Sequence, residues 1–407
     1  MRILHFIPHI PKGDAPYHIR YKWKMVRDMA QYADLHVLTN DVVEALQEPD
    51  MAFHKYASIK TLVGGNKRFF DKCLKRVKPD VAHIHTCWNY SAYLFQKACV
   101  ENMVPVVISV DHLLEEWHVR GNYWLCKRPK AVLYQNWMLS NANALHAIDE
   151  GEYGFFFRKK RLNGKVVVVR NPDETGGMEM QNMVSGLISL YKKVADSNPF
   201  MLMTEMERKA EDCFVMLGLL GTLPRNMSED KDKLFDLSEE SWRRILLHSY
   251  DEGIMGVVCS GCKNAGISIP QIDLNDIDRF ERSGFGLLSE EDNLYKAKLE
   301  AVSEDGLLSG AELQICKSLL DVLSKMANQT VRRLDFYELC RLLRGMDCNE
   351  DLICEKLRVM RVYKKTARLF QILNERYGLG EGFMFMEPLD DKGTKILRHK
   401  LFKSQMQ

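Results

Sequence analysis

Short apolar runs alternate with helix-like stretches through the first 171 residues of the chain. The apolar runs fall at 3–7, 34–39, 53–59, 80–86, 104–110, 144–149 and 165–170. Continuous apolar runs rich in β-branched residues predict parallel strands that are buried on both faces of a sheet. Right-handed β-α-β crossovers between such strands give a doubly wound, Rossmann-like domain. We therefore predict an α/β domain over residues 1–172.

The hydrophobic period changes after Asn171 and Pro172. Residues 173–182 are polar and Gly-rich, which is typical of a linker. Beyond them the apolar positions recur at helical spacing, and only 253–260 resembles a strand. The helical stretches cover 183–196, 204–220, 238–250, 310–327, 334–345 and 351–377, with Gly378 and Gly380 as stops of the last one. The pattern predicts a mostly α-helical domain over residues 183–407.

Composition and charge limit the classes of function. Among 407 residues, 46% are hydrophobic and 28% are charged, as in an ordinary globular protein. No apolar run is long enough to span a membrane, and the N-terminal run is too short for a secretory signal, so we expect a cytoplasmic protein. The first 175 residues carry 25 Lys+Arg against 18 Asp+Glu, whereas the remainder carries 32 against 37. A basic first domain favours anionic ligands, and the acidic second part argues against a nucleic-acid partner.

The cysteines do not predict a metal site. The chain has 11 of them, and only Cys259 and Cys262 form a C-x-x-C pair. A structural zinc site usually needs a second pair at suitable spacing, and none follows. We expect buried or incidental thiols and no bound metal.

Several polar side chains follow predicted strands at the edge where open α/β sheets bind ligands. Lys12 and Gly13 follow the first strand, where a backbone approach to an anion or an ordinary turn would both fit. Trp88 and Asn89 follow the fourth strand and suit a sugar face and a hydroxyl, or packing under a loop. His112 ends the fifth strand, beside Asp111, which could fix its tautomer. His83 and His85 share one face of the fourth strand, as core histidines more often do than ligands.

The order of these segments resembles glycosyltransferase family 4. The strand DVAHIHT (80–86), the strand VPVVISVDH (104–112) and the segment ALHAIDEGEYGFF (144–156) match motifs of the acceptor-side domain of that family. The resemblance covers about residues 1–172. It implies a GT-B enzyme that transfers a sugar with retention of configuration, with a nucleotide sugar as substrate and without a cofactor or an obligatory metal. It also implies a glycan or lipid-linked acceptor.

The same resemblance assigns roles to individual residues. It places His112 at the reaction centre, and Lys12 and Gly13 near the donor phosphates. Trp88 and Asn89 would lie near the acceptor, and Glu152 matches an acidic residue of the family.

The second half does not continue the family pattern. Two echoes of its Glu-x7-Glu motif, at 283–291 and 304–312, lack the surrounding strands and are best explained by chance. Two hypotheses therefore stand. The first is a glycosyltransferase-like enzyme. The second is a non-catalytic glycan- or lipid-binding or assembly protein whose donor domain could come from a separate partner. A nucleotide-binding regulator has less support, because no full G-x-G-x-x-G and no P-loop is present.

The stretch 66–78 predicts a basic amphipathic helix. Its cations could contact an anionic membrane surface peripherally, at the inner face, or could simply be the solvated side of a helix that covers the sheet. The basic residues concerned are Lys67, Arg68, Lys72, Lys75 and Arg76.

Overall fold

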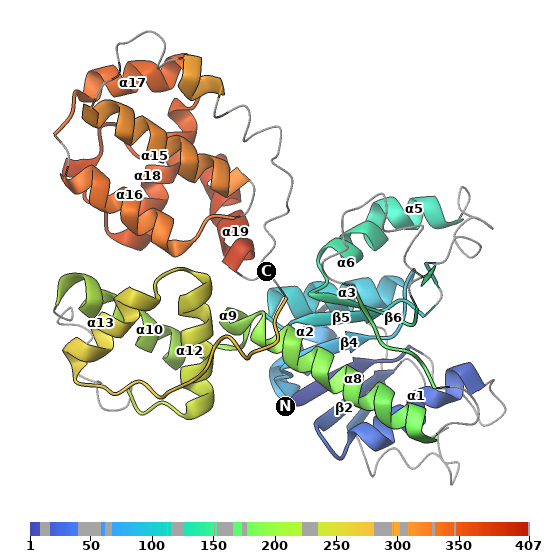
Figure 1. The fold of residues 1–407 in the computed structure, drawn as a ribbon. Helices are drawn as coiled ribbons and strands as arrows, with labels where there is room; N and C mark the ends of the chain where they lie inside the picture. The colour runs from blue at the N-terminus through green and yellow to red at the C-terminus, as the bar shows by residue number, and fades with distance from the viewer. Residues whose placement is uncertain are drawn as a thin grey trace. The chain divides into compact units, whose positions relative to one another are not determined.

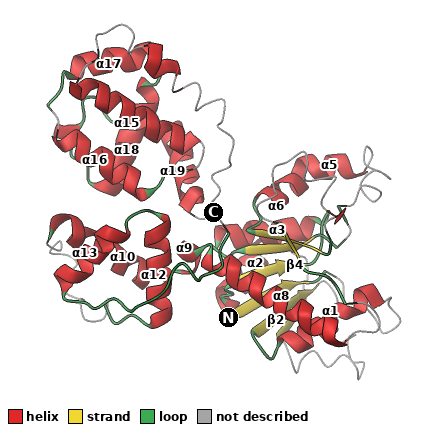
Figure 2. Cartoon of the chain, viewed as in Figure 1, coloured by secondary structure: helices red, strands yellow, loops and turns green. Residues whose placement is uncertain are grey.

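The chain forms two compact units in the computed structural model (Figures 1 and 2). Unit 1 comprises Met1–Leu202 and Asp273–Glu281, and unit 2 comprises Met203–Ile272 and Arg282–Gln407. The described residues are 1–8, 17–39, 58–61, 67–111, 113–114, 126–149, 151–152, 166–172, 177–221, 235–280, 295, 297–301, 308, 310–327, 330–345 and 347–405.

A seven-stranded, fully parallel sheet forms the centre of unit 1. Its strands lie in the order β3-β2-β1-β4-β5-β6-β7, which confirms the predicted doubly wound architecture. The strands are β1 (Arg2–Phe6), β2 (Asp34–Thr39), β3 (Ser58–Thr61), β4 (Val81–Ile84), β5 (Val106–Ser109), β6 (Ala144–Ala147) and β7 (Val166–Val168). Each strand overlaps a predicted one.

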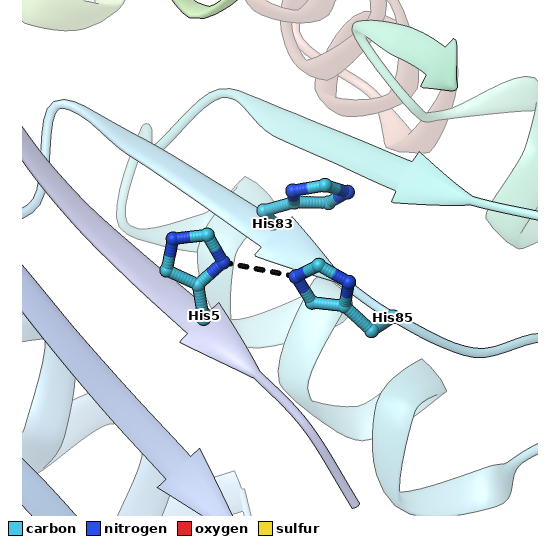
Figure 3. Close-up of side chains that lie close together, drawn as sticks. All are labelled: His5, His83 and His85. Carbon is cyan, nitrogen blue, oxygen red and sulfur yellow. Dashed lines mark hydrogen bonds between the residues drawn. The ribbon is translucent and has the colours of Figure 1, made fainter. Parts of the chain in front are cut away.

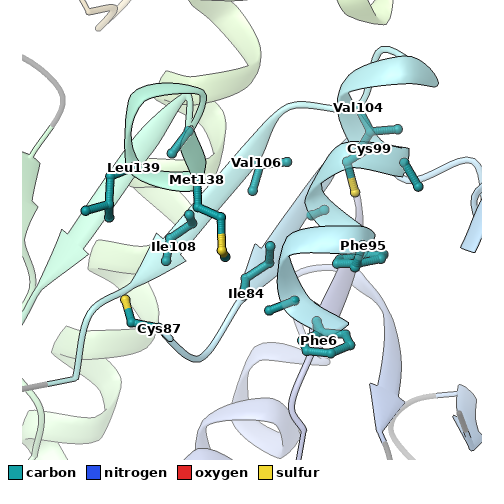
Figure 4. Packing of buried hydrophobic residues seen from close by; sticks show 14 of the residues in the cluster. Phe6, Ile84, Cys87, Phe95, Cys99, Val104, Val106, Ile108, Met138 and Leu139 are labelled. Atoms are coloured by element: carbon teal, nitrogen blue, oxygen red, sulfur yellow. The ribbon is translucent and has the colours of Figure 1, made fainter. Parts of the chain in front are cut away.

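Helices cover both faces of this sheet. The helices of unit 1 are α1 (Tyr17–Met29), α2 (Lys67–Val77), α3 (Tyr90–Glu101), α5 (Arg128–Lys130), the π-helical turn η5 (Ala131–Gln135), α6 (Asn136–Ser140), α8 (Gly177–Asp196) and α9 (Pro199–Leu202). One core holds Phe6 and Ile84 against Phe95 of α3 and Met138 of α6 (Figure 4). Phe70 of α2 belongs to the same core. A second core packs the other face against α1 and α8. This double cover explains why the central strands read as continuous apolar runs.

Helix α8 is part of unit 1. We predicted the domain to end at residue 172 and a linker over 173–182, but α8 begins at Gly177 inside that stretch. Met180, Leu187, Tyr191 and Val194 of α8 pack on the sheet, because the apolar stripe of α8 lies against the same core as Ile3 of β1 and Val81 of β4. Unit 1 therefore extends to Leu202.

Every regular element among the described residues of unit 2 is a helix. Its helices are α10 (Glu205–Leu220), α12 (Glu239–Asp251), α13 (Met255–Ala265), α15 (Gly310–Ala327), α16 (Arg333–Gly345), α17 (Glu350–Val359), α18 (Tyr363–Tyr377), the 3-10 turn η8 (Glu381–Phe383) and α19 (Lys392–Gln405). This agrees with the predicted mostly α-helical region. Helices α13 and α19 were not predicted.

The strand predicted over 253–260 is wrong, because these residues lie largely in α13. Two glycines explain why this segment is a helix and not a strand. A Cβ at Gly261 of α13 would lie 1.8 Å from the carbonyl oxygen of Phe214 in α10, and a Cβ at Gly218 of α10 would lie 2.1 Å from the carbonyl oxygen of Val257. The two helix backbones are therefore in direct contact, and tertiary packing outweighs the β propensity of the valines.

The single helical pattern predicted over 351–377 is two helices. The chain leaves α17 through Arg361, whose φ of 57° ends the helix in the left-handed conformation. The predicted stop at Gly378 is confirmed, since Gly378 caps α18 with a φ of 63°.

A buried ionic network joins three helices of unit 2. The Glu211 carboxylate of α10 lies 2.8 Å from Nδ1 of His248 and accepts hydrogen bonds from Ser249 at 2.8 Å and Arg333 at 3.0 Å. Burial raises the pKa of Glu211, but His248 and Arg333 outweigh it and hold that pKa below its usual value.

Within the described part of the chain, no helix has the length and apolar character needed to cross a membrane.

Candidate functional site

The carboxyl edge of the sheet at β1 and β4 is the candidate site. The strand order reverses there, since β1 continues to β2 on one side and pairs with β4 on the other. Ligands of open α/β sheets bind in the crevice beyond such a switch point. The segments after β4 and β5 carry Trp88, Asn89 and Asp111 to this edge.

Three of the predicted site residues cannot be placed. Lys12, Gly13 and His112 lie outside the described residues. Their assigned roles therefore stay predictions.

Trp88 is nearly buried and tightly held. Its backbone N–H donates to Oε1 of Gln135 at 2.6 Å, its carbonyl accepts from the Tyr134 hydroxyl at 2.9 Å, and its indole N–H donates to the carbonyl of Leu113 at 2.9 Å. The side chain of Lys127 lies 5.8 Å from the ring centroid. Only 9% of the residue is exposed. Trp88 therefore joins the segment after β4 to the segment after β5 through its indole and to the π-helical turn through its backbone, and such turns are frequent at functional sites.

Asn89 and Glu152 have structural partners at the same edge. Asn89 caps α3, because its side-chain oxygen accepts from the Ala92 N–H at 3.0 Å. Glu152 is fully buried, and its Oε2 accepts from the Ile148 N–H at 2.6 Å just after β6. Both residues shape the turns that follow the strands, and neither contact tests the predicted substrate-binding role.

Two backbone conformations at this edge are unusual. Five described residues other than glycine have a positive φ. Lys78, Met103 and Arg361 follow the ends of helices, where the left-handed conformation is a common cap. Trp88, with a φ of 59°, and Asp111, with a φ of 42°, follow strands instead. Non-glycine residues held in this way cost about 1–3 kcal/mol and cluster at functional sites.

A chain of buried polar side chains crosses the sheet beneath this edge. Tyr191 of α8 lies 2.5 Å from Nδ1 of His83, whose Nε2 lies 2.7 Å from the Ser109 hydroxyl. That hydroxyl lies 2.7 Å from Nδ1 of His146, and Nε2 of His146 lies 2.9 Å from the Val169 carbonyl. The strand register pairs Ser109 with His146, which places them side by side.

The carbonyl at one end fixes the direction of every proton in this chain. A carbonyl can only accept, so His146 donates from Nε2 and, being neutral, accepts at Nδ1 from Ser109. Ser109 then accepts from Nε2 of His83, and His83 accepts at Nδ1 from the Tyr191 hydroxyl. Burial lowers the pKa of both His83 and His146 and raises that of Tyr191, so all three groups are neutral near pH 7.

His5 and His85 form a second buried pair beside His83 (Figure 3). Nδ1 of His5 lies 2.9 Å from Nε2 of His85, and the rings of His83 and His85 lie tilted by 34° with their centroids 3.9 Å apart. Burial lowers the pKa of His5 to about 3. It also lowers the pKa of His85, and the nearby His83, His5 and Lys22 lower it further.

These three histidines are the group among the described residues that brings metal-ligating atoms together. One atom from each of His5, His83 and His85 lies within 4.8 Å of the others. Both nitrogens of His83, however, already have hydrogen-bond partners in Tyr191 and Ser109. A cation would also meet the repulsion of the nearby Lys22 ammonium, so a hydrogen-bond network explains the cluster better than a metal site.

Lys22 of α1 pairs with Asp111 at this edge. Its ammonium lies 2.6 Å from Oδ2 of Asp111, and both side chains are 15% exposed. The pair was not predicted, although Asp111 was named as a partner for His112.

A sequence signal for the histidine network was present. His5 and His83 occupy paired positions of β1 and β4, and Ser109 and His146 occupy paired positions of β5 and β6, two residues beyond Val107, the partner of His83. Polar residues at the same register of neighbouring buried strands predict a cross-strand network. The sequence prediction that His83 and His85 share one face is confirmed.

Four of the five basic residues of α2 are exposed, as predicted, and the fifth, Lys67, is engaged in ion pairs. Lys67 forms ion pairs with Asp71 and Glu101. Arg68, Lys72, Lys75 and Arg76 are exposed, and none of the four has an ion pair within the described part of the chain.

Comparisons with known proteins add little to this picture. The sequence matches no protein-family model and no curated protein. A solved structure described as a "putative UDP-N-acetylglucosamine 2-epimerase from Listeria monocytogenes" is similar over 60% of this chain and 71% of that chain, with 8% identity and a TM-score of 0.30. This degree of similarity assigns no activity to the chain.

Proposed function

We propose that this chain is a glycosyltransferase-like protein that binds a nucleotide sugar or a glycan at the carboxyl edge of its parallel sheet. The observation that carries the proposal is the pair of strained residues, Trp88 and Asp111, beside the switch point between β1 and β4. The motif resemblance of residues 1–172 to glycosyltransferase family 4 supports the same class of ligand.

In the catalytic form of this proposal, His112 acts at the reaction centre. It directly follows Asp111 in the sequence, so it belongs to the segment that leaves β5 at the candidate site. Lys12 and Gly13 would contact the phosphates of the donor, since they follow β1 at the same edge. The reaction would need neither a metal nor a further cofactor.

The non-catalytic alternative is favoured by one observation. Every regular element described in unit 2 is a helix, so no second parallel sheet for a nucleotide-sugar donor is present among the described residues. A transferase of this type needs a donor opposite the acceptor. The chain would then bind a glycan or a lipid-linked sugar, while a separate chain supplies the donor domain.

Incubation with a panel of nucleotide sugars separates the two forms. Release of nucleoside diphosphate that disappears in His112→Ala supports a transferase. Binding without release, measured by calorimetry, supports the binding protein. Neither release nor binding, with nucleotide sugars or with oligosaccharides, would overturn the proposal.

A peripheral membrane contact through α2 is part of the proposal. Arg68, Lys72, Lys75 and Arg76 form an exposed cationic stripe that matches an anionic lipid surface. Such a contact would bring a lipid-linked acceptor to the sheet edge.

A further inference from the structure

The Asp111 carboxylate has one satisfied and one unsatisfied oxygen. Oδ2 accepts from the Lys22 ammonium at 2.6 Å. Oδ1 is buried and has no hydrogen-bond partner among the described residues. Buried acceptors are almost always paired in folded proteins, so an unpaired carboxylate oxygen at a candidate site points to a donor from outside the protein.

The backbone holds this oxygen in a fixed place. Asp111 has a φ of 42°, and the turn around it is closed by the Leu113 N–H, which donates to the Val110 carbonyl at 2.8 Å. The Leu113 carbonyl in turn accepts from the Trp88 indole. Two strained residues thus support each other across neighbouring strands, which is the rigidity that a recognition group needs.

The pairing with Lys22 limits the chemistry of the missing donor. The ammonium balances the charge of the carboxylate, so a second cation would be repelled and an anion would meet the remaining lone pairs of Oδ1. A neutral donor, such as a hydroxyl, fits best. A site built to bond a hydroxyl rejects the analogue that lacks it, because its buried polar group is then left unpaired.

We propose that Asp111, held by Lys22, is a specificity residue that accepts a hydrogen bond from one hydroxyl of the bound sugar. This inference rests on the proposed function and names the group that reads the sugar. Lys22 acts as a positioning residue, because it fixes the carboxylate and does not itself contact the ligand in this arrangement.

The test uses UDP-glucose, UDP-galactose, UDP-N-acetylglucosamine and GDP-mannose, with UDP and GDP alone as references. Affinities of the full chain are measured by calorimetry. The nucleotide sugar that binds best is then replaced by its series of monodeoxyfluoro analogues, in which one hydroxyl at a time is replaced by fluorine, which cannot donate a hydrogen bond. Asp111→Asn is the variant, and Asp34→Asn, at the opposite edge of the sheet, is the matched control.

We expect one analogue to bind the native chain about 10- to 100-fold more weakly than the parent sugar, as the loss of a bond to a charged acceptor predicts. Asp111→Asn should weaken binding of the parent sugar by a similar factor, should weaken that analogue no further and should leave binding of the free nucleotide unchanged. Asp34→Asn should bind like the native chain.

Three outcomes overturn the inference. If all analogues bind the native chain with equal affinity, no single hydroxyl is recognised. This measurement uses the native chain alone, so it does not depend on how a variant folds. If Asp111→Asn binds the parent sugar normally, Oδ1 bonds only to ordered water. If no nucleotide sugar binds the native chain at all, the proposed function fails for these donors and the inference fails with it.

Discussion

Four histidines lie inside unit 1 without charge, and their partners explain how they are tolerated. His83 and His146 each use both ring nitrogens, and His5 and His85 bond to each other. Burial lowers the pKa of all four. The sequence predicted His83 and His85 as core residues. It did not predict the bond between His83 and Tyr191, because a partner 108 positions away depends on how α8 packs.

Unit 1 should therefore be sensitive to acid. The unfolded chain takes up a proton at each histidine below its ordinary pKa near 6.5, whereas the folded chain does not. The stabilising effect is complete above pH 6.5 and is lost as the pH falls. Each pH unit below 6.5 should cost about 1.4 kcal/mol for each histidine that stays uncharged in the folded chain, or at most about 6 kcal/mol for the four. Chemical unfolding followed by circular dichroism between pH 7.5 and 5 measures this dependence.

His5→Gln tests the origin of that effect. One of the four groups is removed, so the pH dependence of the unfolding free energy should fall by about a quarter. An unchanged slope, or stability that does not vary between pH 7.5 and 5, would contradict the prediction.

Glu211 should contribute strongly to the stability of unit 2. Its side chain is 2% exposed and it pairs with Arg333, so Glu211→Gln leaves the buried guanidinium with only the exposed carboxylate of Asp212. We expect a loss of about 3 kcal/mol in the free energy of unfolding. Asp212→Asn is the matched control, because Asp212 contacts the same arginine but its side chain is 55% exposed. Equal effects of the two substitutions would contradict the prediction.

At the scale of elements, the close crossing of α10 and α13 makes a sharp prediction. Gly261→Ala places a methyl group 1.8 Å from a carbonyl oxygen of α10, so the helices must separate. The expected loss is about 3 kcal/mol. Gly256→Ala, in the same helix, has nothing within 4 Å and should raise stability by about 0.5–1 kcal/mol. Thermal unfolding of the two variants compares them directly. Similar shifts in melting temperature would contradict the close approach of the α10 and α13 backbones.

The exposed stripe of α2 predicts electrostatic binding to lipid. Arg68→Glu with Lys72→Glu should abolish binding to vesicles that contain phosphatidylglycerol, since each basic residue near such a surface contributes about 1 kcal/mol. Vesicle sedimentation measures it. The matched control carries Lys263→Glu and Lys364→Glu, two exposed positions of unit 2, and should bind like the native chain. Native binding that does not depend on anionic lipid would speak against α2.

The central elements of unit 1 could be predicted because β4, β5 and β6 are buried throughout and lie in apolar runs. The prediction over 253–260 was wrong because helix contact at Gly218 and Gly261 is invisible in local propensity. The candidate site was only partly predictable. The positions of Trp88 and Asp111 follow from the ends of β4 and β5, but the ion pair with Lys22 depends on how α1 lies across the sheet.

At the scale of the whole molecule, a short segment joins the two units in sequence. Asp273–Glu281 follows three helices of unit 2 but belongs to unit 1. Asp278 pairs with Lys193 at 2.7 Å, and the Phe280 N–H donates to the Ser197 hydroxyl at 2.8 Å. The Phe280 ring packs on the core that α8 covers.

Phe280→Ala should therefore destabilise unit 1. The ring is partly buried, so we expect a loss of about 2 kcal/mol, below the value for a fully buried phenylalanine. Phe383→Ala is the control, since Phe383 is 45% exposed in unit 2 and should lose less than about 1 kcal/mol. Differential scanning calorimetry assigns each change to its transition. A shift confined to unit 2 in the Phe280 variant would contradict the division of the chain.

The position of this segment in the sequence also sets an order of events during synthesis. Domains generally fold from the N-terminus as the chain emerges from the ribosome. Unit 1 cannot complete its cover over α8 until residue 281 has emerged from the ribosome, some 80 residues after Leu202. By then α10, α12 and α13 have emerged, while their partner Arg333 of α16 has not. Unit 1 is thus completed only after the first helices of unit 2 have emerged. Unit 2 is completed only after the last segment of unit 1 has emerged.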